Sequence, residues 1–242
     1  MKSNNQPVTE AIILAGGLGS RLRSEVPDLP KPMAPVANRP FLEYLMDYLH
    51  KLGFLKIIMS VGYKHTSIVQ HFGKNYSGMS IEYAIEEEPL GTGGGTLLAG
   101  DKVSGNAPVV VLNGDTWFPV DLIKMVDFHH QRKCSLTIAV HSLVNPGRFT
   151  GVKIGHNQKI VDFCCRDNNE RQWINGGIYV ISPHIFEQWR KLGKRPSALE
   201  NDLIPNCIEG DAAVYAFLEE SPFIDIGVPA DYKRASSILN CT

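Results

Sequence analysis

The sequence lacks the features that mark membrane proteins, secreted proteins and nucleic-acid-binding proteins. None of its apolar runs comes near the roughly 20 residues that a membrane-spanning helix needs. The polar segment 1–10 predicts no signal peptide. The 24 Lys and Arg residues nearly balance the 25 Asp and Glu residues, so the formal net charge is −1. This balance disfavours a basic nucleic-acid binder and an acidic disordered chain, so we expect neither a nucleic acid nor a membrane as a partner.

Disulfide and metal-binding patterns are also missing. The five cysteines are odd in number, Cys164 and Cys165 are neighbours, and no CxxC pair or His/Cys cluster has metal-ligand spacing. This predicts free thiols in a cytoplasmic protein. The eight histidines show no ligand spacing either, and we assign them no role. His129 and His130 end a predicted helix, where positive charge suits the helix dipole.

Alternating strand and helix patterns fill the chain instead. Short apolar runs predict strands, and apolar residues at helical spacing predict helices. In the first half we expect strands at 11–15, 56–61, 81–85 and 108–112, and helices at 41–52, 66–72 and 122–130. In the second half we expect strands at 135–140, 151–154, 159–163 and 174–181, and helices at 183–192 and 229–239. The βαβα order predicts an α/β fold whose mostly parallel sheet is covered on both faces.

No repeat or low-complexity linker marks a domain boundary. We therefore expect a single domain over residues 1–242. Its nucleotide-binding half covers about residues 1–130, and about residues 131–242 supply the acceptor site.

A glycine-rich turn follows the first predicted strand. Gly16, Gly17 and Gly19 would let backbone N–H groups approach a phosphate chain closely. Leu22 stands where a dinucleotide-binding fingerprint has its third glycine, and no strand ending in an acidic residue follows at the expected distance, which disfavours an NAD-linked oxidoreductase. No Gly-Lys-Ser/Thr sequence of a P-loop follows either. The glycines alone favour a phosphate loop and a plain strand-to-helix turn equally.

Two cations favour the phosphate-binding interpretation. Lys31 lies between Pro30 and Pro32, and these prolines predict an extended, preorganised lysine. Arg21 can hold phosphate oxygens through two parallel hydrogen bonds, and Lys31 adds a point charge. Together with the glycines, these residues predict a site for a phosphate chain.

The turn and the lysine together resemble a known family. AGGLGSRL at 15–22 and PKPM at 30–33 are similar to the paired motifs of the sugar-1-phosphate nucleotidyltransferases. Further matches run along nearly the whole chain: EPLGTGG at 88–94, NGD at 113–115, NGG at 175–177 and DIGVP at 225–229. The ending FIDIGVP and the chain length most resemble the branch that acts on D-glycero-D-manno-heptose 1-phosphate, with mannose-1-phosphate guanylyltransferases as close relatives. The resemblance implies a Rossmann-like (GT-A-like) three-layer fold with a mostly parallel mixed central sheet, and a minimal catalytic unit without appended domains.

The reaction that the resemblance implies joins a nucleoside triphosphate to a sugar 1-phosphate and releases pyrophosphate. The nucleophile is an anionic phosphate oxygen, so no general base is needed. Catalysis must then come from positioning and from neutralising charge. By the resemblance, Arg21, Lys31 and Asp115 are the catalytic residues.

Two aspartates form the expected Mg²⁺ site. Asp115 follows a predicted strand, at the edge where open α/β sheets bind ligands, and Asp225 lies in another apolar turn. Mg²⁺ takes few protein ligands and keeps several waters. Taken alone, Asp115 fits a turn or a helix N-cap better, but the resemblance favours the metal. The segment 115–117 (Asp-Thr-Trp) lacks the Asp-x-Asp of sugar-transferring GT-A enzymes, which argues against a glycosyltransferase.

The resemblance also implies a set of nucleotide-binding residues: Leu14, Ala15, Gly16, Gly17, Gly19, Glu86, Gly91, Thr92 and Asn113. We expect segment 86–95 to be a loop that forms the wall against the base. Family members that use pyrimidine nucleotides often have a glutamine near position 86. A carboxylate there can accept from both N1–H and N2–H₂ of guanine, so we expect GTP as the nucleotide, with Glu86 or a neighbour reading the base.

On the acceptor side the resemblance implies Gly151, Asn175, Gly176 and Glu200, although Glu200 taken alone is equally an exposed glutamate of a first helical turn. Many members have a Glu-Lys pair after a strand ending in Phe, where this chain has Cys164-Cys165-Arg166. Arg166 can replace the lysine as a phosphate clamp. Cys165 cannot replace the glutamate as an ionised acceptor, so the usual glutamate contact to the sugar is missing at this position.

These expectations describe a Mg²⁺-dependent guanylyltransferase that makes GDP-heptose from GTP and D-glycero-D-manno-heptose 1-phosphate for a bacterial surface polysaccharide such as capsule or lipopolysaccharide. A mannose-1-phosphate guanylyltransferase and a uridylyltransferase acting on another sugar 1-phosphate are alternatives of the same class. A nucleotide-sensing subunit without catalysis is an alternative of another class, which the four charged residues Arg21, Lys31, Asp115 and Asp225 disfavour. The oligomeric state stays open, a homodimer included.

Overall fold

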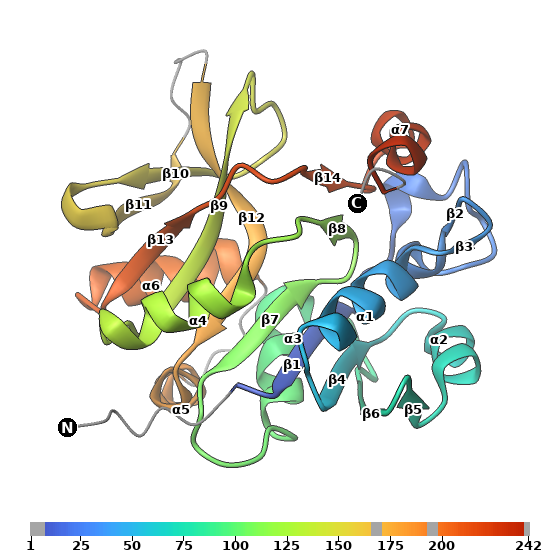
Figure 1. Cartoon of the computed structure of the whole chain (residues 1–242), viewed down its shortest axis with the longest axis horizontal. Helices are drawn as coiled ribbons and strands as arrows, with labels where there is room; N and C mark the ends of the chain where they lie inside the picture. Colours follow the sequence, from blue (N-terminus) through green and yellow to red (C-terminus); the bar gives the residue numbers. More distant parts are fainter. Residues whose placement is uncertain (1–7, 166–170, 193–197, 240–242) are drawn as a thin grey trace.

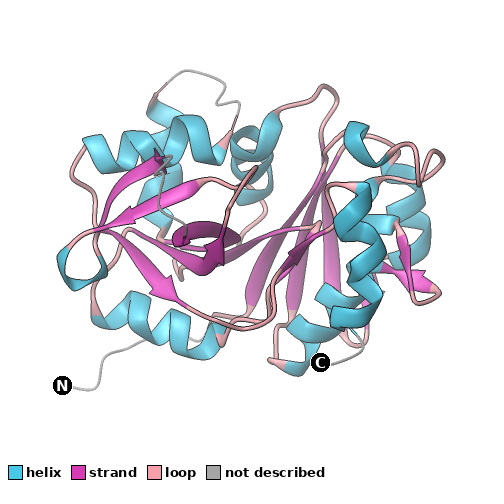
Figure 2. Cartoon of the chain, turned by 90° about the horizontal axis from the view of Figure 1, so that it is seen from above, coloured by secondary structure: helices cyan, strands magenta, loops and turns pink. Residues whose placement is uncertain are grey.

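A sheet of ten strands runs through the molecule, with helices on both of its faces (Figures 1 and 2). The computed structural model describes residues 8–165, 171–192 and 198–239. The sheet contains β1 (Glu10–Ala15), β4 (Lys56–Val61), β5 (Asn75–Tyr76), β6 (Met79–Ile85), β7 (Val109–Asn113), β9 (Leu136–Val144), β10 (Gly151–Ile154), β11 (Ile160–Cys165), β12 (Arg171–Ile181) and β13 (Val214–Leu218). Two separate pairs are formed by β2 (Pro35–Val36) with β3 (Arg39–Pro40), and by β8 (Thr116–Trp117) with β14 (Ile224–Asp225).

The helices cover the sheet in two layers. They are α1 (Phe41–Lys51), α2 (His65–Phe72), α3 (Gly91–Gly100), α4 (Leu122–Gln131), α5 (Pro183–Lys191), α6 (Ile204–Glu209) and α7 (Pro229–Leu239). Single turns of 3₁₀-helix span Ser20–Leu22, Lys31–Met33 and His156–Gln158, and a π-helical turn spans Leu199–Leu203. No helix in the described ranges is both long and apolar enough to cross a bilayer.

Strand order places the carboxyl ends of the first-half strands at one edge. The order is β11-β10-β12-β7-β1-β4-β6-β5, and β9 pairs with β12 and β13. The pairs β7–β1, β1–β4 and β4–β6 are parallel, whereas β12 runs antiparallel to β7 and to β9. The predicted Rossmann-like, mixed sheet with helices on both faces is therefore confirmed. Ligands of such sheets bind beyond the carboxyl ends of the parallel strands.

Two hydrophobic cores lie on opposite faces of the sheet. On β1, Ala11, Ile13 and Ala15 face a core that also holds buried residues of α1, α2, α4 and α7, whereas Ile12 faces a core shared with α3, α5 and α6. This alternation is what the period of two along a strand dictates. Burial on both faces explains why β1, β4 and β7 are almost wholly apolar in sequence.

The predicted loop at 86–95 is wrong in its second part, because helix α3 begins at Gly91. Glycines disfavour helices by propensity, but here Gly93, Gly94 and Gly95 are buried. A Cβ on Gly95 would stand 2.7 Å from the Ser60 hydroxyl oxygen of β4. Close packing of the helix on the sheet thus requires small residues, and tertiary contacts override propensity.

Two further expectations need correction, on Lys31 and on His129. Lys31 is not extended but opens a 3₁₀ turn, which the N–H groups of Met33 and Ala34 close on the carbonyls of Pro30 and Lys31. Pro32 is tolerated because the first turn of a helix leaves its N–H groups unused. The strand β13 and the helical segment from Leu199 to Glu209 were not predicted.

The second correction concerns His129, which is buried rather than charged. Burial, with further repulsion from His130 and His184, lowers the pKa of His129 to about 3. Its two ring nitrogens lie 2.9 Å from the hydroxyls of Thr137 and Ser182. The residue is therefore neutral at pH 7 and stabilises the core through hydrogen bonds, not through the helix dipole.

Candidate active site

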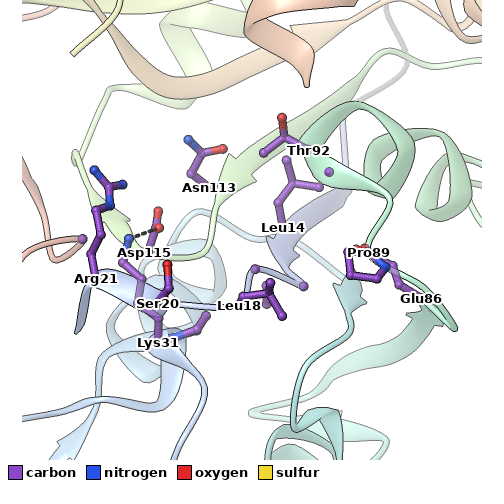
Figure 3. A pocket seen from close by; sticks show the side chains of 17 residues that line it. Leu14, Leu18, Ser20, Arg21, Lys31, Glu86, Pro89, Thr92, Asn113 and Asp115 are labelled. Atoms are coloured by element: carbon purple, nitrogen blue, oxygen red, sulfur yellow. Dashed lines mark hydrogen bonds and ion pairs between the residues drawn. The ribbon is translucent and has the colours of Figure 1, made fainter. Parts of the chain in front are cut away.

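A cavity of about 390 Å³ lies beyond the carboxyl ends of β1 and β7 (Figure 3). Its walls come from the segment after β1, from the start of α3 and from the end of β7. The lining residues are Leu14, Ala15, Gly16, Gly17, Leu18, Gly19, Ser20, Arg21, Lys31, Pro32, Glu86, Pro89, Gly91, Thr92, Asn113, Asp115 and Gly227. Every residue that the sequence predicts to be catalytic or nucleotide-binding is in this set. The fold therefore brings these residues to one cavity, although they are scattered along the chain.

Two glycines set the shape of the cavity wall. Gly19 has a φ of +59°, a left-handed conformation, and a Cβ on it would stand 3.2 Å from the Cβ of Lys31. A Cβ on Gly114 would stand 2.7 Å from the Leu14 carbonyl oxygen. Glycine thus lets the turn approach Lys31 and lets the backbone before Asp115 lie against β1.

The charged end of the cavity is built around Lys31. Its ammonium group contacts the Asp115 carboxylate and lies 3.5 Å from Oδ1 of Asp225. The two aspartates are far apart in sequence, but β8 and β14 pair Thr116 with Asp225, and the Ile226 N–H donates to the Asp115 carbonyl. Both carboxylates therefore face one cation, whose side chain is only 11 % exposed.

Arg148, which the sequence analysis missed, holds Asp225 from the other side. Its guanidinium donates to Oδ2 of Asp225 at 3.1 Å, to the Asp225 carbonyl at 3.0 Å and to Asp231 at 3.0 Å. Burial opposes ionisation of Asp225, but the charges of Lys31 and Arg148 outweigh it and hold the pKa of this carboxyl below its ordinary value. Arg148 lies in an irregular turn, and no spacing in the sequence connects it with Asp225.

Arg21 differs from Lys31 and Arg148 in having no partner among the described residues. It makes no hydrogen bond or ion pair with any residue in the described ranges. Figure 3 shows its side chain at the same end of the cavity as Asp115 and Lys31. A guanidinium that the protein leaves unneutralised beside a glycine turn can bind an anionic ligand such as a phosphate chain.

The carboxylate oxygens at the charged end of the cavity are suitable ligands for a hard divalent cation. Asp115 and Asp225 converge on one cationic group, so the site already attracts positive charge. The described residues contain no cluster of three or more His, Cys, Asp or Glu side chains that could hold a metal. Two carboxylates without a third side chain suit Mg²⁺, which takes its other oxygens from phosphates and water.

Glu86 occupies the opposite end of the cavity, beside Pro89 (Figure 3). Its Oε1 accepts a hydrogen bond from the Ser60 hydroxyl at 2.9 Å, and its Oε2 accepts one from the Leu90 N–H at 3.0 Å. A Cβ on Gly16 would stand 2.2 Å from Oε1, so only glycine leaves room for this carboxylate. The glutamate is therefore fixed in place at the far end from the charged cluster.

Two of the predicted acceptor residues, Asn175 and Glu200, do not line the cavity but connect to it through hydrogen bonds. Glu200 accepts from the Thr92 hydroxyl at 3.0 Å and from the Tyr179 hydroxyl at 3.2 Å, and Asn175 donates to Tyr179 at 2.7 Å. Burial and the Glu200 charge raise the pKa of Tyr179 well above its ordinary value, so its hydroxyl stays protonated. Glu200 is thus part of a network that reaches from β12 to the start of α3, and not an exposed first-turn glutamate.

The remaining acceptor predictions are only partly placed. Gly151 begins β10, and Gly176 lies in β12, where a Cβ would stand 2.6 Å from the Phe118 ring. Neither residue lines the cavity. Arg166 and the side chain of Cys165 lie outside the described part of the chain.

Comparisons with known proteins show what the chain is similar to. A family model described as nucleotidyl transferase matches residues 10–240. The D-glycero-alpha-D-manno-heptose 1-phosphate guanylyltransferase of Aneurinibacillus thermoaerophilus is 43 % identical over 230 residues, which cover 95 % of this chain and 98 % of that protein. The protein of the same name from Campylobacter jejuni is 37 % identical over 223 residues, with 92 % and 96 % covered. The crystal structure of HddC from Yersinia pseudotuberculosis superposes on this chain with a TM-score of 0.83 at 32 % sequence identity. The superposition covers 95 % of this chain and 99 % of the HddC chain, and HddC has also been solved in complex with GMP-PN.

Proposed function

The chain belongs to the nucleotidyl transferase family, and we propose that it is a guanylyltransferase acting on D-glycero-D-manno-heptose 1-phosphate. The products are GDP-heptose and pyrophosphate. The single observation that carries this proposal is the cavity that has a cationic cluster at one end and a fixed glutamate at the other. A nucleoside triphosphate has the matching pattern, with anionic phosphates at one end and a base at the other.

The reaction requires positioning and charge neutralisation more than proton transfer. An oxygen of the sugar phosphate attacks the α-phosphorus of GTP, and a new P–O bond forms. The bond from the α-phosphorus to the bridging oxygen breaks, and its electron pair leaves with pyrophosphate. We propose that Arg21 and Lys31 hold the triphosphate and neutralise the charge that develops on the leaving pyrophosphate. The backbone of the glycine turn, Gly16 to Gly19, completes the cradle.

We propose that Asp115 and Asp225 hold Mg²⁺. When bound, the ion would neutralise and orient the phosphate oxygens. Lys31 faces both carboxylates, and Arg148 adds its charge beside Asp225. These two charges hold the pKa of Asp225 below its ordinary value, although burial opposes this.

The second half of the chain would bind the sugar phosphate. We propose this role for Gly151, Arg166, Asn175, Gly176 and Glu200. The first half, to about residue 130, would then bind the nucleotide within a single domain of residues 1–242. We further propose that the enzyme works in the cytoplasm and supplies a bacterial surface polysaccharide.

A matrix of nucleotides and sugar 1-phosphates tests this function directly. Pyrophosphate release is measured with GTP, UTP, CTP, ATP and TTP against heptose, mannose and glucose 1-phosphates, with and without Mg²⁺. We expect release with GTP and the heptose phosphate, and only in the presence of Mg²⁺. Turnover with UTP alone would contradict the proposal, and turnover with GTP and mannose 1-phosphate alone would assign the enzyme to the mannose branch.

We also propose that Glu86 reads guanine. A Glu86→Gln variant keeps the size of the side chain but replaces one acceptor by a donor, which opposes one N–H of guanine. We expect the ratio of kcat/KM for GTP to that for UTP to fall by about tenfold to a hundredfold. Glu87→Gln and Glu88→Gln serve as controls because these residues do not line the cavity. An unchanged GTP-to-UTP ratio in Glu86→Gln would show that another group reads the base.

A further inference from the structure

Ser60 is a buried polar residue with no role in the reaction proposed above. It lies near the end of β4, its side chain is fully buried, and every other residue of β4 except Lys56 is a buried apolar one. Its hydroxyl donates to Oε1 of Glu86 at 2.9 Å. A serine at this position lacks the apolar surface that its neighbours contribute to the core, so a polar function accounts for it better than packing does.

The two oxygens of Glu86 are held by two different kinds of donor. The Leu90 N–H, at 3.0 Å from Oε2, can only donate, whereas the Ser60 hydroxyl can donate or accept by rotating. Leu90 directly precedes the first residue of α3, and a helix N-terminus favours a negative charge. Both contacts place a hydrogen-bond donor against one oxygen of Glu86.

The two hydrogen bonds from Ser60 and Leu90 leave the Glu86 carboxylate able to accept further hydrogen bonds. Each carboxylate oxygen has two lone pairs, and the protein uses one on each. Glu86 can thus accept two more N–H bonds, the number that N1–H and N2–H₂ of guanine offer. Oε1 also lies close to the backbone of Gly16 and Gly95. A Cβ on these residues would stand 2.2 Å and 2.9 Å from Oε1, so a side chain at either position would displace the carboxylate.

We propose that Ser60 is the positioning residue for guanine selection: it fixes the Glu86 carboxylate so that both oxygens present their free lone pairs to the base. This inference rests on the proposed function, in which Glu86 reads guanine. Ser60 does not touch the substrate in this scheme and acts only through Glu86. Without the hydroxyl, Oε1 keeps no donor from the described residues, and the carboxylate can rotate away from the orientation that the base requires.

The test compares GTP with inosine triphosphate, which has N1–H but lacks the 2-amino group. In Ser60→Ala we expect the ratio of kcat/KM for GTP to that for ITP to fall by about fivefold, through a higher KM for GTP with kcat preserved. A purely structural role would change both nucleotides alike and leave this ratio constant. Ser60→Cys, whose thiol is a weak donor, should lower the ratio similarly and serves if the alanine variant does not fold.

Ser182→Ala is the matched control. Ser182 is also buried, and its hydroxyl donates to the Cys134 carbonyl at 2.8 Å, remote from the cavity. We expect this variant to lose stability but to keep the GTP-to-ITP ratio. In a Glu86→Gln background, adding Ser60→Ala should leave the ratio unchanged, because Ser60 acts only through the carboxylate.

The outcomes separate the two proposals. If the wild-type protein prefers GTP and Glu86→Gln removes the preference, but both Ser60 variants keep the wild-type ratio, the role of Ser60 is overturned and the proposed function stands. If the wild-type protein does not prefer GTP over UTP and ITP, guanine selection itself fails, and the role of Ser60 fails with it. A fall of the ratio in the Ser60 variants alone, with Ser182→Ala unchanged, supports the inference.

Discussion

Replacing Lys31 with methionine is expected to lower kcat by about a hundredfold to a thousandfold, the range for removing one preorganised charge from a transition state. The ammonium of Lys31 faces Asp115 and Asp225, and its removal leaves two carboxylates without the cation that lies between them. The same change removes a positive charge from the phosphate end of the cavity. Pyrophosphate release at saturating GTP and sugar phosphate measures the effect, and circular dichroism checks that the variant is folded.

Two companion variants show whether the position matters as well as the charge. Lys159→Met removes another lysine that is paired with an aspartate, Asp211 at 2.6 Å, on the surface and outside the cavity, so it should keep wild-type kcat. Lys31→Arg keeps the charge. A Cβ on Gly227 would stand 2.8 Å from the Lys31 ammonium, so the space is narrow, and we expect the arginine variant to be strongly impaired too. Activity near that of the wild type in Lys31→Met would remove Lys31 from the mechanism.

Replacing Asp225 with asparagine is expected to lower kcat by about a hundredfold or more and to raise the Mg²⁺ concentration that supports half of the remaining activity. The charge of the carboxylate is lost, while its shape is kept. The asparagine amide would also turn a donor towards Arg148 or Lys31, which are donors themselves. The measurement is pyrophosphate release over a Mg²⁺ titration, with isothermal titration calorimetry of Mn²⁺ as a binding readout independent of activity.

Asp231 provides a closely matched control for Asp225. Both aspartates accept hydrogen bonds from the same guanidinium, that of Arg148, at 3.1 Å and 3.0 Å. Only Asp225 also faces Lys31. Asp231→Asn should therefore keep most of the activity and an unchanged Mg²⁺ requirement. Full activity of Asp225→Asn with Mg²⁺ would refute the metal assignment, and equal losses in both variants would trace the effect to Arg148 instead.

The sequence predicted much of the fold because its signals are local. Apolar runs at residues 11–15, 56–61 and 108–112 bury both faces of a strand and need no tertiary information to be found. The glycine-rich α3 was missed because its glycines disfavour a helix in isolation and are required only by close packing on β4. The turn at Lys31 was mispredicted because a proline in the first turn of a helix costs no hydrogen bond, which the pattern Pro-Lys-Pro does not reveal.

The chemical groups available to this protein can be found from its sequence: a glycine turn, two cations, two aspartates and a glutamate, in motifs that resemble one family. How these groups meet depends on the tertiary structure. Asp225 reaches Asp115 because β14 pairs with β8, and Arg148 reaches Asp225 from a turn that no motif marks. Ser60 reaches Glu86 because β4 and β6 are parallel neighbours, and the Glu86 N–H donates to the Val61 carbonyl at 2.8 Å. Spacing along a chain identifies residues that share one strand or helix, but contacts between distant elements depend on strand order and packing, which the whole sequence fixes jointly.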